Sequence, residues 1–328
     1  MAKIPRWRWW VWGVEVVLLF AVVEHFAIRP HIRKTKAVVD MPQIHGAQVE
    51  VLGEAARLPD DLHEVAPSYY PLLEGLAEGS ERMLETQKSV SHDKGLPVEV
   101  ENRLGMRFRL VPSGSCLIGS PTNERGRGSI EVQHVQLFPE DFYMGKFEVT
   151  QAEWKKVMGI TDEPSVFKGD KRPVEEVTWY DCQRFVNKLC ELEGVPPNTY
   201  QLPTEAEWEY ACRGGTDTSF CFGDQPDRLG IWADFADNNC KQTAEIGRRR
   251  CNSLGLYDMH GNVWEWCRDL YVNYPGDDSN AGDRYGYRTI RGGNWYVGAW
   301  ECRSANRCCL PPASHGNMLG FRVMRRIK

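Results

Sequence analysis

The sequence predicts an α+β fold with much irregular backbone, preceded by an N-terminal hydrophobic helix. Short runs of alternating apolar and polar residues, which are typical of strands, are interleaved with short helical segments. The chain of 328 residues carries 12 Trp, 30 Gly and 19 Pro. This composition favours a turn-rich fold packed around aromatic side chains over a helical bundle. A hydrophobic content of 42% is enough for a sizeable core.

The charge balance excludes one class of partner. Lys and Arg number 40 against 45 Asp and Glu, which gives a formal net charge of -5. This balance gives no electrostatic reason to expect binding to nucleic acid, so we expect no nucleic-acid partner. The 11 cysteines are an odd number and favour neither an oxidising nor a reducing compartment.

The first residues predict attachment to a membrane. Trp9–Ile28 reads WWVWGVEVVLLFAVVEHFAI, which is about long enough to span a hydrocarbon layer as a helix, although Glu15 and Glu24 lower its hydrophobicity. No small-residue cleavage site follows, so we expect a retained anchor; a signal peptide and a soluble amphipathic helix are the alternatives. Basic residues flank both ends, so the positive-inside rule does not fix the orientation. We expect the chain to be membrane-anchored with its domain outside the cytoplasm.

The chain divides into three segments by composition and residue pattern. Residues 1–35 are the expected anchor or signal segment. Residues 36–97 are polar and weakly patterned, and they predict a linker with some helix, favoured at Leu72–Val90 but interrupted by two glycines. Short strand-like runs begin near Val98, so 98–328 is the expected folded domain.

Local signals place the first strands and the first helix of that domain. Met106–Val111 and Phe142–Thr150 have strand patterns. Thr150 and Glu153 then form a T-x-x-E capping box that opens a helix, and Gly159 ends it.

Two more helices and a closing strand follow. The segment YDCQRFVNKLCELEG has its apolar residues on one helical face and stops at Gly194. Thr204 and Glu207 form a second capping box, and a Gly-Gly pair after Arg213 ends that helix. The residues expected on the buried faces of these helices are Cys182, Phe185, Val186 and Leu189, then Trp208, Ala211 and Cys212. GFRVMRR, Gly320–Arg326, is the expected closing strand.

Several long motifs in series carry a resemblance to a known family. They are EVTQAEWKKVMG, RPVEEVTWYD, LPTEAEWEYACRGG, GLYDMHGNVWEWCRD, RGGNW and LGFRV, in that order. The region from Val98 to Lys328 resembles the formylglycine-generating enzymes, also called sulfatase-modifying factors. The resemblance implies the fold of that family, a variant of the C-type lectin fold. It also implies oxidation of a cysteine in an unfolded sulfatase segment to formylglycine.

The segment GLYDMHGNVWEW is a candidate cation loop. Its carboxylates and exposed carbonyls are the hard oxygen ligands that calcium prefers, whereas acidic residues of turns are more often simply solvated. The resemblance implies structural calcium bound through the side chains of Asp258 and Glu265 and the carbonyls of Gly261 and Val263.

A second calcium site is implied in WADFADNNC. Its ligands would be Asp234, the carbonyl of Phe235, and Asn238. The loop is shorter here than in many members of the family. Catalytic zinc is not expected, because the sequence has neither C-x-x-C nor H-E-x-x-H.

Only one of the two cysteines that bind copper in the family has a matching cysteine in this sequence. Two cysteines after a Gly-Gly-Ser motif bind Cu(I) in the active oxidases, and thiolates suit that soft ion. Counted from the glycine pair of RGGNW, the first falls on Val297 and the second on Cys302. The serine and the tyrosine of the oxygen site fall on Asn294 and Glu301. Linear bis-thiolate coordination is therefore not expected from this pair.

Cys302 keeps two interpretations. It is the candidate catalytic thiol, matching the second copper ligand. A gapped match counted back from GFR makes it instead the cysteine that the family joins by a disulfide to the one matching Cys212. Cys308 and Cys309 are vicinal, and either buried packing or a bond to Cys240, Cys251 or Cys267 would account for them.

Two functions follow from these matches. The favoured one is a divergent sulfatase-modifying factor that lacks the copper-binding pair and acts as a membrane-tethered binding domain for a polypeptide, with structural calcium. The alternative is a formylglycine-generating oxidase that uses Cys302 with another thiol, such as Cys308, together with copper, and acts on sulfatase segments. Iron-dependent sulfoxide chemistry would need a histidine-bearing helical domain that this sequence does not contain.

Overall fold

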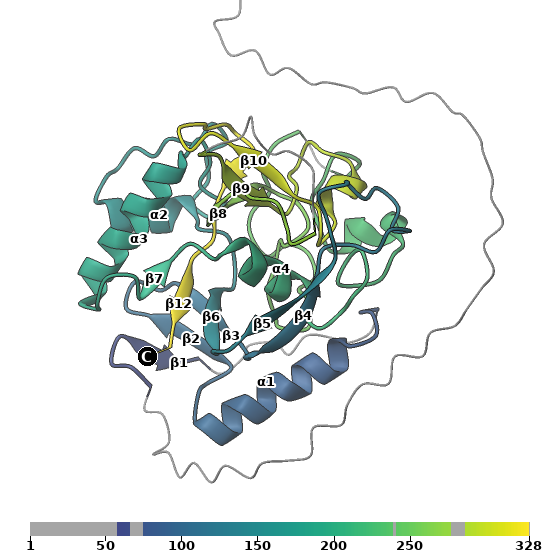
Figure 1. Ribbon diagram of the computed structural model, residues 1–328. Helices are drawn as coiled ribbons and strands as arrows, with labels where there is room; N and C mark the ends of the chain where they lie inside the picture. The colour runs from purple at the N-terminus through teal and green to yellow at the C-terminus, as the bar shows by residue number, and fades with distance from the viewer. Residues whose placement is uncertain (1–57, 66–74, 239–240, 277–285, 328) are drawn as a thin grey trace, which may run out of the picture. The chain divides into compact units, whose positions relative to one another are not determined.

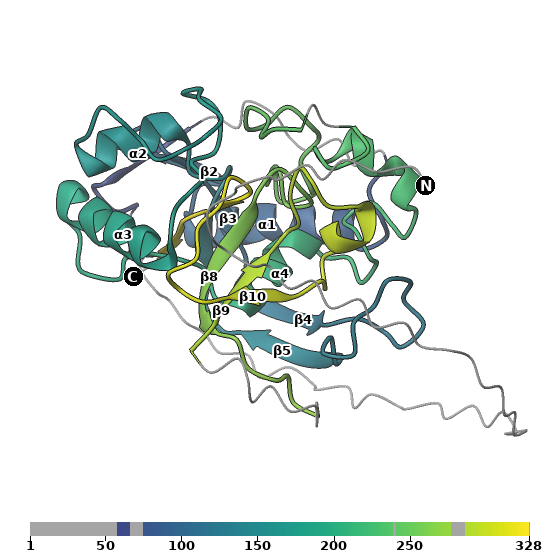
Figure 2. The ribbon, with the colours of Figure 1, turned by 90° about the horizontal axis from the view of Figure 1, so that it is seen from above.

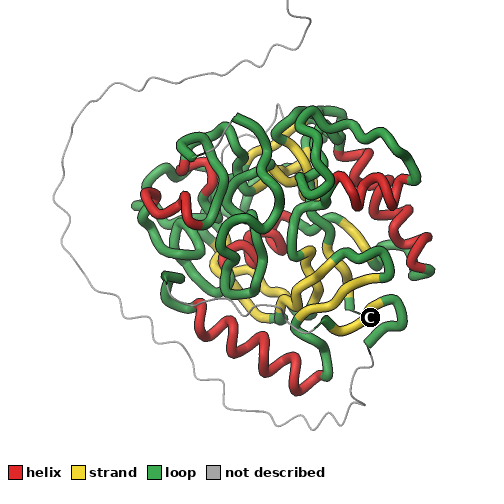
Figure 3. Tube along the Cα trace, turned by 180° about the vertical axis from the view of Figure 1, so that it is seen from behind, coloured by secondary structure: helices red, strands yellow, loops and turns green. Residues whose placement is uncertain are grey.

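The computed structural model describes residues 58–65, 75–238, 241–276 and 286–327. The hydrophobic helix expected at Trp9–Ile28 lies outside this range. Within the range, no helix combines the length and the apolar character needed to cross a bilayer. The prediction of mixed helices and strands with much irregular backbone is confirmed, since loops and turns account for a large part of the trace in Figure 3.

The largest sheet has six antiparallel strands in the order β1-β2-β3-β6-β12-β7 (Figure 1). Its strands are β1 (Leu62–Glu64), β2 (Glu99–Asn102), β3 (Arg107–Val111), β6 (Phe142–Gly145), β12 (Met324–Arg326) and β7 (Tyr200–Gln201). The last strand of the chain thus lies in the interior of this sheet, beside strands that are far from it in sequence.

A second sheet and a hairpin complete the β structure. The four-stranded sheet has the order β10-β9-β8-β11, and only its β11–β8 pair is parallel. Its strands are β8 (Trp264–Leu270), β9 (Arg288–Arg291), β10 (Cys308–Leu310) and β11 (Leu319–Gly320), while β4 (Gly114–Ile118) pairs with β5 (His134–Phe138) in a separate antiparallel hairpin.

The predicted helices form where their caps predicted them. Thr150 caps α2 (Gln151–Met158) and Thr204 caps α4 (Glu205–Arg213), each through the full capping box. In both cases a glycine in the left-handed conformation follows the last turn. Between them, α3 spans Trp179–Glu193 and ends at Gly194.

The segment that precedes the main domain contributes two elements. Strand β1 pairs with β2, and helix α1 (Ser80–Lys94) begins after Gly79, so it starts later than the segment Leu72–Val90 in which we expected a helix. The buried side chain of Gln87 in α1 donates to the carbonyl of Leu110 at 2.6 Å. Part of residues 36–97 is therefore folded against the domain.

The expected closing strand is divided between the two larger sheets. Leu319–Gly320 belongs to β11 and Met324–Arg326 to β12. The intervening Arg322 is fully buried and pairs with Glu265 of β8, so the chain turns inward instead of continuing as one strand.

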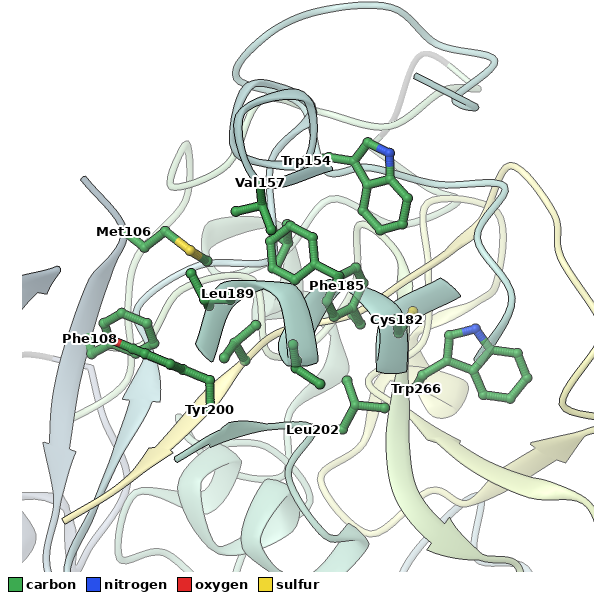
Figure 4. Packing of buried hydrophobic residues seen from close by; sticks show 14 of the residues in the cluster. Met106, Phe108, Trp154, Val157, Cys182, Phe185, Leu189, Tyr200, Leu202 and Trp266 are labelled. Atoms are coloured by element: carbon green, nitrogen blue, oxygen red, sulfur yellow. The ribbon is translucent and has the colours of Figure 1, made fainter. Parts of the chain in front are cut away.

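The main core lies between α2, α3 and the sheets (Figure 4). The rings of Trp154 and Phe185 stack with their centroids 5.5 Å apart, and Phe321 meets both rings edge-on. Cys182, Phe185, Val186 and Leu189 are all buried, as the helical pattern predicted. The aromatic packing that the tryptophan count suggested is thus present.

Candidate functional site

The candidate site is built on the loop that follows β9. Gly292 and Gly293 both have positive φ, at 99° and 77°. A Cβ on Gly293 would lie 2.6 Å from the Sγ atom of Cys302 and 3.1 Å from its Cα atom. Only glycine fits there, because the loop folds back on itself and ends in the short 3-10 helix η3 (Ala299–Cys302).

Cys302 is enclosed in this loop. The residue has 0% exposure, and its thiol donates weakly to the carbonyl of Gly298 at 3.6 Å. Burial, reinforced by the negative charge of Glu301, raises the pKa of the Cys302 thiol far above its usual range. The thiolate that a nucleophile or a copper ligand needs is therefore disfavoured.

Val297 packs against the same cluster. This cluster contains Cys302 and the aromatic side chains of Phe220, Phe222 and Trp232. At the position of the first family cysteine the structure thus has a half-buried aliphatic side chain that helps to enclose Cys302.

Cys212 and His260 lie on the inner side of the loop. Cys212 and Cys302 are both free thiols, so the disulfide implied for them is not formed here. The Nδ1 atom of His260 lies 2.9 Å from the carbonyl of Cys302, and its Nε2 atom accepts from the backbone N–H of Cys221 at 3.2 Å. These two partners assign the ring proton to Nδ1, and burial lowers the pKa of His260 to about 4.

The residues at the family's oxygen site have other roles. The Oδ1 atom of Asn294 accepts from the backbone N–H groups of Tyr296 and Val297 at 2.7 and 3.1 Å, so this side chain shapes the loop. Its Nδ2 atom is buried and has no hydrogen-bond partner within the described ranges. Glu301 is exposed.

The outer side of the loop presents aromatic groups. Tyr296 is 64% exposed. The guanidinium of Arg125 lies over the half-buried ring of Trp300, 4.9 Å from its centroid. An open pocket of about 420 Å³ adjoins Trp300, lined by Pro121, Asn123, Glu124, Arg125, Asp217, Thr218, Ser219, Asp224 and Trp300.

The pocket is acidic. Asp217 and Asp224 are exposed, and the Oδ1 atom of Asp224 accepts from both the backbone N–H and the hydroxyl of Ser219. Glu124 shares Arg303 with the buried Glu131, so one guanidinium serves two carboxylates. Arg125 therefore faces more than one carboxylate, and the pocket favours a cationic group. Sequence patterns did not reveal this pocket, because its walls come from three separate segments.

The loop at which we expect the first calcium, Gly255–Trp266, lies beside one more carboxylate than the sequence indicated. Glu265 is bound by Arg322 in a bidentate pair at 2.6 and 2.7 Å and accepts from Trp208 Nε1 at 2.7 Å. Asp258 accepts from the backbone N–H of Gly247 at 2.7 Å. Glu148, which lies far away in sequence, is also buried next to this loop.

Two carboxylates at this loop are buried and disfavoured as anions. Burial, with the nearby Asp234 and Glu265 carboxylates, raises the pKa of Asp258 to about 6, and burial with the charges of Asp258 and Glu265 raises that of Glu148 well above its usual range. The three carboxylates outnumber Arg322, and the raised pKa values mean that Glu148 and Asp258 bind protons more readily here than in water. No three His, Cys, Asp or Glu side chains in the described parts of the chain are arranged to hold a metal, so ligation would also need the carbonyls implied at Gly261 and Val263.

The ligands implied for the second calcium site are engaged within the protein. Arg249 makes a bidentate pair with Asp234 at 2.7 and 3.1 Å. Asn238 Oδ1 accepts from the N–H of Phe235, while the carbonyl of Phe235 accepts from the N–H of Asn238. Asp234 is therefore already paired with a guanidinium, and the second calcium site stays a prediction.

Comparison with known proteins agrees with this architecture. The model of the sulfatase-modifying factor enzyme 1-like domain matches residues 95–327. Chaperone protein LppX of Paenibacillus barcinonensis is 35% identical over 202 residues, which cover 47% of this chain and 69% of LppX. The formylglycine-generating enzyme of Streptomyces coelicolor is 31% identical over 198 residues, covering 53% of this chain and 58% of that enzyme.

Other relatives share the domain within different proteins. The serine/threonine-protein kinase pkn1 of Chlamydia caviae is 34% identical over 166 residues, which cover 48% of this chain and only 25% of the kinase. Treponema denticola variable protein 1 has a TM-score of 0.61 at 28% identity, over 70% of this chain and 99% of that one. PvdO from Pseudomonas aeruginosa has a TM-score of 0.60 at 26% identity, over 68% and 95% of the two chains.

Proposed function

The chain belongs to the family of the sulfatase-modifying factor enzyme 1-like domain, and we propose that it is a divergent member that binds a polypeptide partner without oxidising it. The observation that carries the proposal is the loop after β9. Val297 replaces one thiol of the family's copper pair, and the other, Cys302, is buried with a raised pKa. The scaffold remains while the reactive pair is missing.

The same loop offers a binding surface. Tyr296 is exposed beside Trp295, and on the other side Trp300 forms one wall of the acidic pocket. An aromatic ring beside Asp217 and Asp224 suits a Lys or Arg side chain, which would stack on the ring and pair with a carboxylate. Such a group would take the position that Arg125 now holds over Trp300.

Two further features support a polypeptide as partner. One relative at 35% identity is named a chaperone protein, and another is a formylglycine-generating enzyme. The proposed pocket is open to one side and is lined mostly by polar groups, which suits a side chain of a larger ligand more than an enclosed small molecule.

Calcium and the membrane complete the proposal. Calcium would be held by Asp258, Glu265 and the carbonyls of Gly261 and Val263, and it would balance the excess carboxylate charge that includes Glu148. The segment Trp9–Ile28 would tether the domain to a membrane, with the domain outside the cytoplasm.

The oxidase alternative requires thiols that differ from the family's pair. Cys308 is an exposed residue of β10, whereas Cys302 is fully enclosed. A copper site shared by these two residues would require the loop to open, which would expose the aromatic cluster around Cys302.

Binding to a short fluorescein-labelled peptide with one central arginine tests the proposal. The control peptide carries citrulline, which is neutral and has nearly the same shape. The arginine peptide should bind more tightly, and Trp300→Ala or Asp217→Asn should weaken its binding about tenfold, the effect of ~1.4 kcal/mol. Leu192→Ala, an exposed residue of α3, is the matched control. Equal binding of both peptides, or no effect of either pocket variant, would contradict the proposed site.

A further inference from the structure

We propose that the outer edge of β5 is a second binding surface, which pairs with an extended strand of another polypeptide. It is separate from the pocket at Trp300, so it does not depend on the function proposed above. Four observations on the β4–β5 hairpin carry this inference.

The first observation is that β5 lies at a sheet edge. In the described part of the chain, β4 and β5 form a sheet of two strands only. Helix α4 packs against β4, and Figure 2 shows β5 on the outer side of β4. On β5, the carbonyl of Leu137 accepts a hydrogen bond from the side-chain amide of its neighbour Gln136. A strand at an edge presents backbone N–H and C=O groups that can pair with another strand.

The second observation is that neither strand is protected by charge. Gly114–Ile118 and His134–Phe138 contain no Lys, Arg, Asp or Glu. Soluble proteins commonly guard an exposed edge with charged residues, with proline or with a bulge, because an unguarded edge pairs with other chains. The register of the hairpin runs without a break from the Gly114–Phe138 pair to the Ile118–His134 pair, so no bulge interrupts it.

The third observation is a groove along this edge. Its volume is about 440 Å³. The last three residues of β5, Gln136, Leu137 and Phe138, line it together with Pro139, Glu140 and Phe142, which follow the strand. Successive side chains of a strand point to opposite faces of the sheet. A groove that all three residues of β5 line therefore lies at the edge of the strand. No residue of β4 lines it, and the start of α4 forms part of its other wall.

The fourth observation is an apolar row on the outer face of the hairpin. Val135 and Leu137 are each 68% exposed, and Leu117, which pairs with Val135, is 39% exposed. A strand added beside β5 would place alternate side chains next to this row, where burial of apolar groups is favourable.

The groove specifies the other side chains of the added strand. Its other walls are Phe142, the start of α4 and the ion pair of Arg326 with Glu207, 2.5 Å apart. A polar side chain that points into the groove would meet this ion pair. The fitting partner is an extended segment without proline that alternates apolar and polar residues, and backbone hydrogen bonds would supply much of its affinity.

This inference can be tested by selecting binders from a displayed library of random linear peptides. The target is the full chain in mild detergent. The enriched peptides should alternate apolar and polar residues. Their binding should fall at least tenfold in the double variant Val135→Lys/Leu137→Lys, which changes only exposed positions, and should persist in Leu192→Lys. N-methylation of alternate peptide amides should abolish binding, and a bound peptide should protect the amides of Val135 and Leu137 from hydrogen exchange.

Three outcomes would overturn the inference. One is a selection that yields no peptide dependent on Val135 and Leu137. Another is protection from exchange elsewhere in the chain while these two amides exchange as before. The third is a wild-type dimer that the double variant converts to a monomer, which would assign the edge to a second copy of this chain. The double variant should still bind the arginine peptide at Trp300, so the two proposals fail separately.

Discussion

The Sγ atom of Cys302 occupies the space that a side chain at Gly293 would need, since an ideal Cβ on Gly293 would lie 2.6 Å from it. The glycine pair and the cysteine are thus parts of one packed turn. The backbone of this turn encloses the sulfur. In an oxidase, the same backbone would have to leave the sulfur accessible to a substrate.

Gly293→Ala should destabilise the domain by about 2 to 4 kcal/mol, which combines the cost of an L-residue at φ 77° with that of overpacking. Urea unfolding measures this change. Gly316→Ala is the matched control, because its Cβ would have no neighbour within 4 Å, and its effect should be within about 0.5 kcal/mol. Equal effects of the two substitutions would show that the packed turn does not matter.

Glu265→Ala should destabilise the domain by about 3 to 5 kcal/mol, because it leaves the buried Arg322 without its bidentate partner. Unfolding in the presence of a chelator separates this loss from any loss of calcium. Glu301→Ala, at an exposed carboxylate, should have little effect. The double variant Glu265→Leu/Arg322→Met should recover part of the stability, and a double variant as unstable as Glu265→Ala would contradict this account.

Calcium should raise the melting temperature, since a ligand that binds only the native state stabilises it by ~2.7 kcal/mol at a hundredfold excess over its Kd. Asp258→Asn should remove this response while it leaves the pair of Glu265 and Arg322 in place. Differential scanning calorimetry with calcium and then with chelator makes the comparison. If neither calcium nor chelator changes the melting temperature of the wild type, calcium does not bind at this loop.

His260 should make the domain less stable in mild acid. Its pKa falls from 6.5 to about 4 in the folded state, so the unfolded chain binds the proton first as the pH falls. Above pH ~6.5 the ring is neutral in both states, and the free energy of unfolding does not depend on its protonation. As the pH falls from ~6.5 to ~4, the free energy of unfolding decreases by about 3 kcal/mol in total. The slope of unfolding free energy against pH should be shallower in His260→Gln across this window. An unchanged slope would mean that His260 does not titrate as the structure indicates.

Local chemistry explains why the helices could be predicted. Thr150 with Glu153, and Thr204 with Glu207, satisfy the first backbone N–H groups of their helices within a few residues, so sequence spacing is sufficient. Thr178 and Asp181 form a third box at α3, which is harder to recognise in the sequence because aspartate replaces the usual glutamate.

Features that depend on distant residues could not be predicted. The β4–β5 hairpin was missed because a long irregular loop with no short turn motif separates its strands. Glu265 was assigned to calcium, but its pairing with Arg322 joins residues far apart in sequence. The partners of His260 likewise come from two other segments, so neither its neutral state nor its packing against Cys302 follows from the sequence.

The most direct test of the central claim is to incubate the full chain in air with Cu(I), a Cys-x-Pro-x-Arg peptide and an excess of a dithiol reductant, which keeps the peptide thiol reduced and supplies electrons for the reduction of oxygen, and then to weigh the recovered peptide. Because Val297 replaces a thiol and Cys302 is enclosed, the peptide should be recovered with its thiol intact. Recovery of the peptide as the formylglycine aldehyde, with the conversion lost in Cys302→Ser, would show that the chain is an oxidase and contradict the account.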